Sequence, residues 1–423
     1  MPTDIERVLE QIDKEELANL AISLGDIYSP PGQEKPVAEF VQTWLQREGF
    51  ETRVLALVPE RPNVVGILPG SGGGYSLAFN SHMDVAPATP EFFRDPMKPI
   101  LRKAWREGEA LYGMGVVNDK GPLACFLCAA KAIKKAGITL RGDLVLTAVS
   151  GEIGYEPVDE FVPPSYLSKE VGTRFVVSHG GIADYALVAE ATNFHLAWIE
   201  AGKAFFKITV FGGRSMYTPY ISRPYEPEKN PNAIFQMTRL VQRLEDWALD
   251  YEKKHTYVCP GGTLIPKVSV GAVRGGAPYR PTTTPELCSI YVDCRITPNQ
   301  DALALRAELE DVMSSLKIAG KVELFVFRRG YEAQNIDRLA DAIGRAHLTT
   351  FGEKPKAVVG PECSMWRDTN VYNEVGIPSA TYGPAAGAGS YGALCITVDD
   401  LYRGAKVYAM VALDLCNQEK KAD

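Results

Sequence analysis

The sequence predicts an α/β fold, in which a mainly parallel sheet is flanked by helices and a smaller α+β domain is inserted. Over roughly the first 200 residues, short apolar runs bounded by proline or glycine alternate with amphipathic helical segments. Near Ala201 this pattern gives way to strands of alternating polarity, and it resumes after residue 328. We therefore expect one domain from residues 1–200 and 329–423, with residues 201–328 as the inserted domain.

The first domain is expected to begin with two helices and to continue with buried strands. The two helices, over residues 5–28 and 35–47, are separated by the breaker Ser29-Pro30-Pro31-Gly32. Apolar runs of strand length and longer helical patterns follow. The expected strands cover 63–68, 76–80, 143–150 and 379–382, and the expected helices 121–136, 339–350 and 398–416.

The inserted domain has the pattern of an α+β unit. Residues 205–211 alternate in polarity as a half-exposed strand does, and a Gly-Pro-rich loop and a long helix follow. Further strands are expected at 267–273, 289–295 and 322–327, and helices at 232–253 and 301–316.

Composition excludes several classes of protein. The 423 residues are 46% hydrophobic and 23% charged, which is ordinary for globular enzymes. A net charge of -7 attracts no phosphate backbone, so we expect no nucleic-acid partner. Residues 1–20 carry acidic side chains and no long apolar run, so we expect neither a signal peptide nor a membrane partner, and a cytoplasmic location. Eight scattered cysteines, Cys125 and Cys128 among them, are typical of reduced core residues rather than disulfides or a zinc site.

A candidate metal ligand stands at the end of the second expected strand. His82 is followed two residues later by Asp84, and a carboxylate in that position can hold a ligating imidazole in one tautomer. A single His-x-Asp pattern is weak evidence for a metal site by itself, so the interpretation depends on the surrounding motifs.

A glycine-rich loop over residues 113–121 opens the next helix. It lacks the third glycine of a dinucleotide-binding loop and carries Asn118 and Asp119, whose oxygens suit a metal better than a phosphate. The strand ending at residue 150 then leads into Gly151 and Glu152. Glu152 is a candidate general base, and the alternative is that it only orders a water or a neighbouring group.

These motifs, in this order, resemble peptidase family M20, which includes acetylornithine deacetylase and succinyl-diaminopimelate desuccinylase. The resemblance covers nearly the whole chain and includes Glu190 in Ala-Glu-Ala-Thr, which is similar to a later acidic metal ligand. It implies a zinc-peptidase-like α/β catalytic domain, residues 1–200 and 329–423. It also implies a ferredoxin-like lid and dimerisation domain, residues 201–328, through which we expect a homo-oligomer.

The sequence departs from the family at four positions. The bridging aspartate falls on Asn118, although the adjacent Asp119 offers a substitute, and the catalytic base falls on Gly151. The C-terminal histidine ligand falls on Ser390, and the lid histidine falls on Tyr217. What remains implies one divalent metal per subunit, manganese or zinc, held by His82, Glu190 and Asn118 or Asp119.

The resemblance implies metal-activated water attacking a carbon bonded to nitrogen, with Glu152 as base and Asp84 supporting His82. The chain as a whole also resembles the atypical aromatic member of the family, and this resemblance, together with the losses, implies an aminohydrolase that converts 5-nitroanthranilate to 5-nitrosalicylate and ammonia. The expected substrate is a small molecule with a carboxylate. Two alternatives stay open: an amidase, aminoacylase or peptidase on small N-acyl amino acids, and a catalytically dead relative that binds small molecules.

Three further residues are candidates for substrate binding. Arg367 offers a bidentate partner for a substrate carboxylate, with a salt bridge to Asp368 or Glu362 as the alternative. Tyr217 offers a hydrogen bond to a developing oxyanion or, equally, a packing role. Ser390 occupies the position of the lost histidine. The other four histidines, at 179, 195, 255 and 347, are expected to be surface or core residues.

Overall fold

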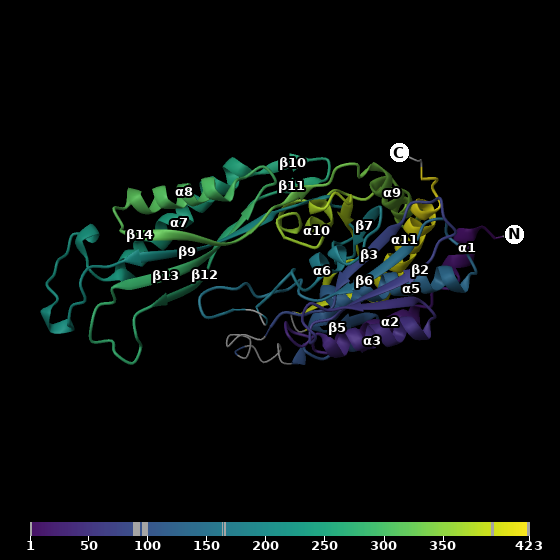
Figure 1. Cartoon of the computed structure of the whole chain (residues 1–423), viewed down its shortest axis with the longest axis horizontal. Helices are drawn as coiled ribbons and strands as arrows, with labels where there is room; N and C mark the ends of the chain where they lie inside the picture. Colours follow the sequence, from purple (N-terminus) through teal and green to yellow (C-terminus); the bar gives the residue numbers. More distant parts are fainter. Residues whose placement is uncertain are drawn as a thin grey trace. The chain divides into compact units, whose positions relative to one another are not determined.

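A computed structural model describes residues 2–87, 94, 100–162, 164, 166–390 and 393–420. The chain forms two compact units. The first comprises residues 1–198, 333–358 and 367–423, and the second comprises residues 199–332 and 359–366 (Figure 1). The short segment 359–366, which the sequence placed in the first domain, belongs to the second unit.

The first unit is built on a six-stranded sheet with the order β1-β2-β6-β3-β7-β16. The pairs β6-β3, β3-β7 and β7-β16 are parallel, whereas β1 and β2 are antiparallel to their neighbours. The expected, mainly parallel sheet is therefore confirmed. The strands are β1 Glu51–Leu55, β2 Asn63–Leu68, β3 Leu77–His82, β6 Leu144–Val149, β7 Tyr185–Val188 and β16 Ser379–Thr381.

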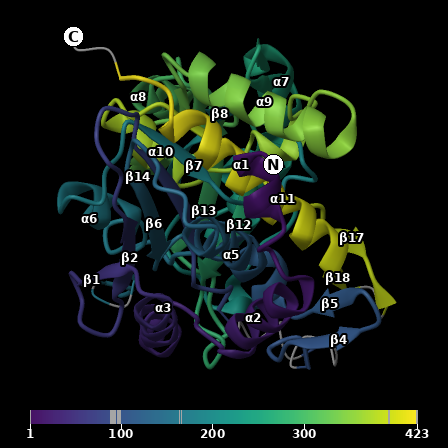
Figure 2. The same cartoon turned by 90° about the vertical axis from the view of Figure 1, so that its right-hand side faces the viewer.

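Helices cover both faces of this sheet. Leu77 and Phe79 point to one face and join a core made with α2, α3, α5, α9 and α11, while Ala78 points to the other face, which packs against α6 and α10. Figure 2 shows α6 across β6 and β7 from α5 and α11. The helices are α1 Asp4–Leu9, α2 Lys14–Asp26, α3 Lys35–Arg47, α5 Gly121–Lys135, α6 Thr173–Ser178, α9 Asp337–Phe351, α10 Thr369–Glu374 and α11 Val398–Cys416.

The single helix expected over residues 5–28 is wrong, because the chain breaks it into α1 and α2. The Asp13 side chain accepts hydrogen bonds from the amides of Glu15 and Glu16, which caps α2 and starts a new helix there. A four-stranded sheet was also not foreseen, because its strands are short and separated along the chain. It pairs β17 Gly387–Ala388, β18 Leu394–Thr397, β5 Ala110–Tyr112 and β4 Trp105–Glu107 in that order.

The second unit has a four-stranded antiparallel sheet with the order β12-β13-β9-β14. Its chain order is β-α-β-β-α-β, as in ferredoxin-like folds. Asn232 and Asp301 cap the two helices through their side-chain oxygens. These elements are β9 Gly202–Phe211, α7 Ala233–His255, β12 Val268–Gly275, β13 Leu287–Ile296, α8 Ala302–Ser315 and β14 Gly320–Arg328; short strands are β8 Ile199–Glu200, β10 Tyr257–Cys259, β11 Gly262–Leu264 and β15 Tyr331–Glu332.

No helix in the described ranges is both long enough and apolar enough to span a lipid bilayer. The eight cysteines are free thiols, and Cys125 and Cys128 are buried in α5 as expected.

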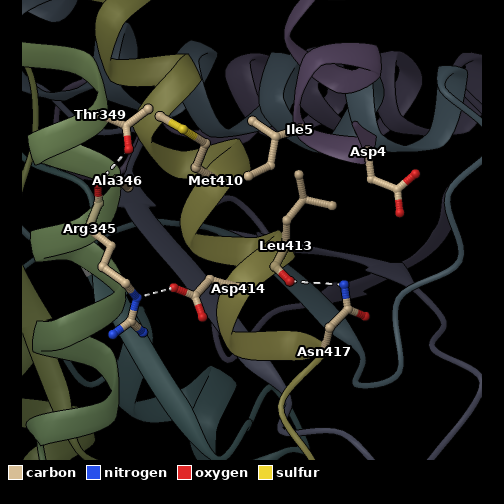
Figure 3. Close-up of a pocket in the computed structure, with 9 residues that line it drawn as sticks. All are labelled: Asp4, Ile5, Arg345, Ala346, Thr349, Met410, Leu413, Asp414 and Asn417. Atoms are coloured by element: carbon tan, nitrogen blue, oxygen red, sulfur yellow. Dashed lines mark hydrogen bonds and ion pairs between the residues drawn. The ribbon is translucent and has the colours of Figure 1, made fainter. Parts of the chain in front are cut away.

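A surface hollow of about 400 Å³ lies among α1, α9 and α11 (Figure 3). Its polar groups satisfy one another, since Arg345 Nε lies 2.7 Å from Asp414 Oδ2 and Asn417 donates to the carbonyl of Leu413 at 2.9 Å.

Candidate metal centre

His82 is the last residue of β3 and is almost fully buried. Its Nδ1 lies 2.9 Å from the carbonyl oxygen of Asp84 and 3.6 Å from the Asp84 carboxylate. The Asp84 carboxylate instead accepts hydrogen bonds from the amides of Glu152, at 3.1 Å, and Ile153, at 2.7 Å. The carbonyl of Asp84 is thus the nearest partner of the imidazole, while its carboxylate lies beside the ring and also ties the loop after β6 to the end of β3. The expected support of His82 by this carboxylate stays a prediction.

The other imidazole nitrogen faces the rest of the site. His82 Nε2 lies 2.8 Å from Asn118 Oδ1 and 4.0 Å from Glu152 Oε2. Two ligands of one metal ion with bonds of about 2.1 Å stand about 3 Å apart when they are at right angles. The spacing between His82 and Asn118 therefore fits two neighbouring ligands.

Asp119 and Glu190 complete a buried cluster around His82. Among the described residues, His82, Asp119 and Glu190 form one group whose possible ligand atoms all lie within 4.8 Å of one another. Ser81 Oγ donates to Asp119 Oδ2, whereas Asp119 Oδ1 is buried without a hydrogen-bond partner in the described part of the chain. A buried carboxylate oxygen with no partner is what a cation would satisfy.

Electrostatics favour a positive charge in this cluster. Burial, followed by the charge of Glu190, raises the pKa of Asp119 well above its ordinary value. Burial also raises the pKa of Glu190, against the opposing effects of Arg367 and His82. Burial alone lowers the pKa of His82, but Asp84, Glu152 and Asp119 outweigh it and raise that pKa well above its ordinary value.

The donor set therefore fits a divalent transition metal. One imidazole nitrogen and two carboxylates, with an amide oxygen beside them, suit manganese or zinc. All four side chains come from segments near the carboxyl edge of the parallel strands, where ligands bind in open α/β sheets.

Glu152 is held by a buried lysine that the sequence did not single out. Lys169 Nζ donates to Glu152 Oε1 at 2.5 Å and to Asp368 Oδ1 at 2.9 Å. Burial lowers the pKa of Lys169, but the charges of Asp368 and Glu152 outweigh it and raise the pKa overall, so the ammonium persists at neutral pH. This ammonium fixes the carboxylate of Glu152 next to the cluster.

Gly151 takes the position at which the family resemblance expects the base. Its φ is +77°, and a Cβ there would lie 2.5 Å from the carbonyl oxygen of Ser168. A glutamate at this position would need the backbone to move. The local conformation is therefore built for glycine, and Glu152 is the carboxylate that the loop presents.

The three substrate-binding candidates lie in different surroundings. Arg367 is buried, with its Nε 3.6 Å from Glu190 Oε2, and Asp368 is engaged by Lys169. Ser390 is exposed, and its amide donates to the hydroxyl of Tyr112 at 2.9 Å. Tyr217 belongs to the second unit, where it is 51% exposed beside Tyr220. Their roles toward a substrate stay predictions.

Sequence analysis missed Lys169 and Ser81, and it considered Asp368 only as a partner of Arg367. Lys169 contacts Glu152 from 17 residues away and Asp368 from 199 residues away, so no short motif contains the trio. Ser81 stands directly before His82 and offered a signal, because a strand-end hydroxyl next to a ligand is well placed to orient a second ligand.

A buried His, Asp and Glu cluster at the carboxyl edge of a parallel sheet defines a candidate metal-binding α/β protein. The profile of peptidase family M20/M25/M40 matches residues 78–414. The chain belongs to this family and is a metal-dependent hydrolase of C–N bonds.

The curated proteins that this chain resembles have several different activities. N-formyl-4-amino-5-aminomethyl-2-methylpyrimidine deformylase of Bacillus subtilis is 29% identical over 331 residues, which cover 72% of this chain and 68% of the relative. Acetylornithine deacetylase of Myxococcus xanthus is 26% identical over 401 residues, which cover 90% and 92%.

Solved structures show the same fold at low sequence identity. Human carnosine dipeptidase 1 matches with a TM-score of 0.71 and 16% identity, over 99% of this chain and all of that chain, 100%. The B. subtilis YXEP protein, a dinuclear metal-binding peptidase of family M20, matches with a TM-score of 0.60 and 15% identity, over 95% and 97%. The expected fold class is confirmed.

Proposed function

We propose that the protein is a one-metal hydrolase that cleaves a C–N bond in a small carboxylate-bearing substrate, with Glu152 as general base. The carboxylate of Glu152 carries this proposal, because it stands 4.0 Å from His82 Nε2 and is fixed there by Lys169. A base must lie within reach of the water that it deprotonates, and this position is beside the cluster.

His82, Asp119 and Glu190 would hold the metal, with Asn118 Oδ1 as a fourth donor. When bound there, a divalent cation would supply a water of lowered pKa and would stabilise negative charge on the substrate. Glu152 accepts the proton of that water, and Lys169 keeps the carboxylate aimed during the transfer. Proton return from Glu152 to the departing nitrogen completes the cleavage.

The count of one metal rests on the second site's missing donors. The described residues contain one group of three or more metal-binding side chains, and the position that the family resemblance gives to the C-terminal histidine ligand holds the exposed Ser390. The dinuclear relative YXEP uses two ions. Metal analysis of the purified protein tests the count, and two tightly bound ions per subunit would contradict it.

Within this class we favour 5-nitroanthranilate as substrate, with water giving 5-nitrosalicylate and ammonia. The nitro group is para to the amine, so it accepts the charge that develops when hydroxide adds to the ring carbon. One metal and one base are enough for such an activated carbon. Ordinary amides lack this electron sink and gain more from a second metal, which supports the aromatic substrate over the peptide.

Amide hydrolysis is the second candidate, and the relatives favour it. The named activities of the B. subtilis and M. xanthus relatives, a deformylase and a deacetylase, both remove an acyl group from nitrogen. Ammonia release from 5-nitroanthranilate by the manganese-loaded protein, measured beside a panel of N-acyl amino acids, separates the two. Turnover of the acyl panel alone would reject the aromatic substrate and keep the hydrolase.

The base assignment has its own test. Glu152→Gln should abolish turnover while the metal content stays unchanged, since Glu152 is not in the ligand group. Glu374→Gln is a matched control, because Glu374 is a surface carboxylate paired with Arg174. Near wild-type rates in Glu152→Gln would retire Glu152 as base.

We also propose that two copies associate through the second unit. β12 is an edge strand of its sheet, and Ile234 on α7 and Val273 on β12 are 42% and 66% exposed beside a groove of about 590 Å³. Val273→Lys should lower the mass measured by light scattering, whereas Val258→Lys, on β10 of the same unit, should not. Equal masses for both variants would contradict this interface.

A further inference from the structure

The carboxylate of Glu152 faces two different groups with its two oxygens. Its Oε2 lies 4.0 Å from His82 Nε2, on the side of the proposed metal, and its Oε1 accepts a hydrogen bond from Lys169 Nζ at 2.5 Å. In two-metal sites the ions stand about 3.5–4 Å apart, and a carboxylate that offers one oxygen to each ion spans that distance. Here an ammonium holds the second oxygen.

Lys169 places its ammonium between two buried carboxylates. Its Nζ also donates to Asp368 Oδ1 at 2.9 Å, and the lysine and aspartate side chains are 1% and 2% exposed. An ammonium is a compact point charge, so it neutralises these oxygens much as a small metal ion would. An ion that used the same two carboxylates would have to displace the ammonium and leave it buried without these partners, which is strongly unfavourable.

The backbone just before Lys169 is tied to its surroundings. The preceding residue, Ser168, donates through Oγ to the Gly151 carbonyl at 3.2 Å, which joins it to the loop after β6. The carbonyl of Leu167 accepts a hydrogen bond from the buried guanidinium of Arg61. The fold therefore holds the ammonium as a fixed part of the centre, beside the loop that carries the proposed base.

A second internal cation lies against a ligand of the proposed metal. Arg367 is 4% exposed, and its Nε lies 3.6 Å from Glu190 Oε2. Like charges repel one another more strongly in a buried site than in water, because the effective dielectric constant is lower there. Arg367 and Lys169 thus offset part of the negative charge that would otherwise attract a second divalent ion.

We propose that Lys169 takes the place of a second metal ion, and that its ammonium limits the centre to one divalent ion by occupying Glu152 and Asp368. This inference rests on the proposed function, in which the His82 cluster holds one metal. It goes further by naming the residue that sets the count. The missing donor at Ser390 leads to a different expectation, because its absence alone would keep the count at one after Lys169 is replaced.

The test is a manganese titration of the full-length protein, with the bound ions counted by elemental analysis after equilibrium dialysis. Lys169→Ala removes the ammonium and opens space for an ion, so it should bind two ions per subunit where wild type binds one. The second ion should bind at least about tenfold more tightly than it binds to wild type, because the repulsion by the ammonium is gone. Electron paramagnetic resonance should show spin-coupled manganese pairs in Lys169→Ala and isolated ions in wild type, a change that loss of structural support alone would not produce.

Two further variants of Lys169 and one of another lysine control this experiment. Lys169→Arg keeps the positive charge and should keep one ion. Lys169→Gln is uncharged but can still donate hydrogen bonds to the carboxylates, and it carries the same prediction of two ions if Lys169→Ala fails to fold. Lys131→Ala is the matched control and should keep one ion, because Lys131 also pairs with two carboxylates, those of Glu16 and Glu48, but these side chains are 35% and 16% exposed.

One ion per subunit in both Lys169→Ala and Lys169→Gln would overturn the role of the ammonium and leave the one-metal hydrolase intact. Failure of both variants to fold in saturating manganese would also overturn it, since an ion in place of the ammonium should offset the two buried carboxylates. Failure of the proposed function gives a different result, because two ions bound to wild type itself would reject the one-metal count before any variant is measured.

Discussion

Lys169 and Glu152 form a buried ion pair beside the metal centre, with 2.5 Å between Nζ and Oε1 and only 1% of the lysine side chain exposed. The second partner of the lysine, Asp368, is 2% exposed. Three charged groups are thus held away from water, and the ammonium of Lys169 offsets the negative charge of the two carboxylates. Two carboxylates that share one buried cation are sensitive to its loss.

Lys169→Met should lower kcat by about 10²–10⁴-fold, because it releases the proposed base from its position. It should also lower the free energy of unfolding by about 3–5 kcal/mol, since Glu152 and Asp368 lose a buried partner. Lys131→Met is a control on a lysine paired with Glu16 and Glu48 at the edge of α5. A kcat near that of wild type in Lys169→Met would show that Glu152 needs no such support.

Arg61 is expected to position the loop that carries Lys169. Its guanidinium binds Glu34 Oε1 at 2.7 and 2.9 Å and donates to the carbonyl of Leu167, and both charged side chains are buried. Arg61→Met should cost about 3–5 kcal/mol of stability and reduce kcat, because Leu167 is two residues from Lys169.

The double variant Glu34→Gln with Arg61→Met separates stability from positioning. It removes both buried charges, so it should recover part of the stability that Arg61→Met loses. Its kcat should stay low, since the bond to Leu167 is still absent. Thermal melts and steady-state rates on the three proteins measure the two effects, and full recovery of kcat would contradict a positioning role.

The elements that sequence predicted well are those specified by local pattern. The apolar run of β2 and the amphipathic helix α11 have the bounds expected from their residues. His82 was recognisable because a strand ends at it, and Glu190 because its Ala-Glu-Ala-Thr segment resembles the segment of the family's later acidic ligand. Parallel strands bring such residues to one edge, so their spacing along the chain predicts a shared site.

The rest depends on contacts between distant segments. Sequence left Asn118 and Asp119 as alternative ligands, and only the fold places the Asn118 oxygen at His82 and the Asp119 carboxylate in the cluster with Glu190. Lys169 had no motif because its partners come from other loops. Burial and long-range charge pairing, which decide these roles, are properties of the folded chain.

Metal binding should depend on the side chains of the His82, Asp119 and Glu190 cluster. Wild type is expected to bind one manganese or zinc ion per subunit, and Glu190→Gln should bind it more weakly. Loss of an outer hydrogen-bond partner already costs roughly 10–100-fold in metal affinity, so loss of a ligand should cost more. Added metal at about 100 times Kd should stabilise wild type by about 2.7 kcal/mol and leave Glu190→Gln nearly unchanged, as read by thermal melts.

A surface carboxylate provides the control for the metal experiment. Glu419→Gln changes a carboxylate that is mostly exposed, so its metal content and melting temperature should match wild type. Equal stabilisation of wild type and Glu190→Gln by added metal would mean that the ion binds elsewhere.

Stability at mildly acidic pH should depend on His347. This histidine is 5% exposed, its Nδ1 lies 2.7 Å from the hydroxyl of Tyr382, and its ring packs on Phe351. Burial is the main cause that lowers its pKa, Glu353 opposes this effect, and His195 adds to it. A histidine pKa that is lower in the folded than in the unfolded chain means that unfolding takes up a proton.

The contribution of His347 is therefore fully present above the unfolded pKa near 6.5 and is lost as pH falls from there toward the lower folded pKa. When the pH is lowered from about 7.5 to 5.5, the melting temperature of His347→Gln should fall less than that of wild type. His179→Gln, at an exposed position after α6, should keep the wild-type slope. Because other groups also titrate in this range, the difference between the slopes of His347→Gln and wild type is the measurement, and identical slopes would remove His347 as a cause of acid sensitivity.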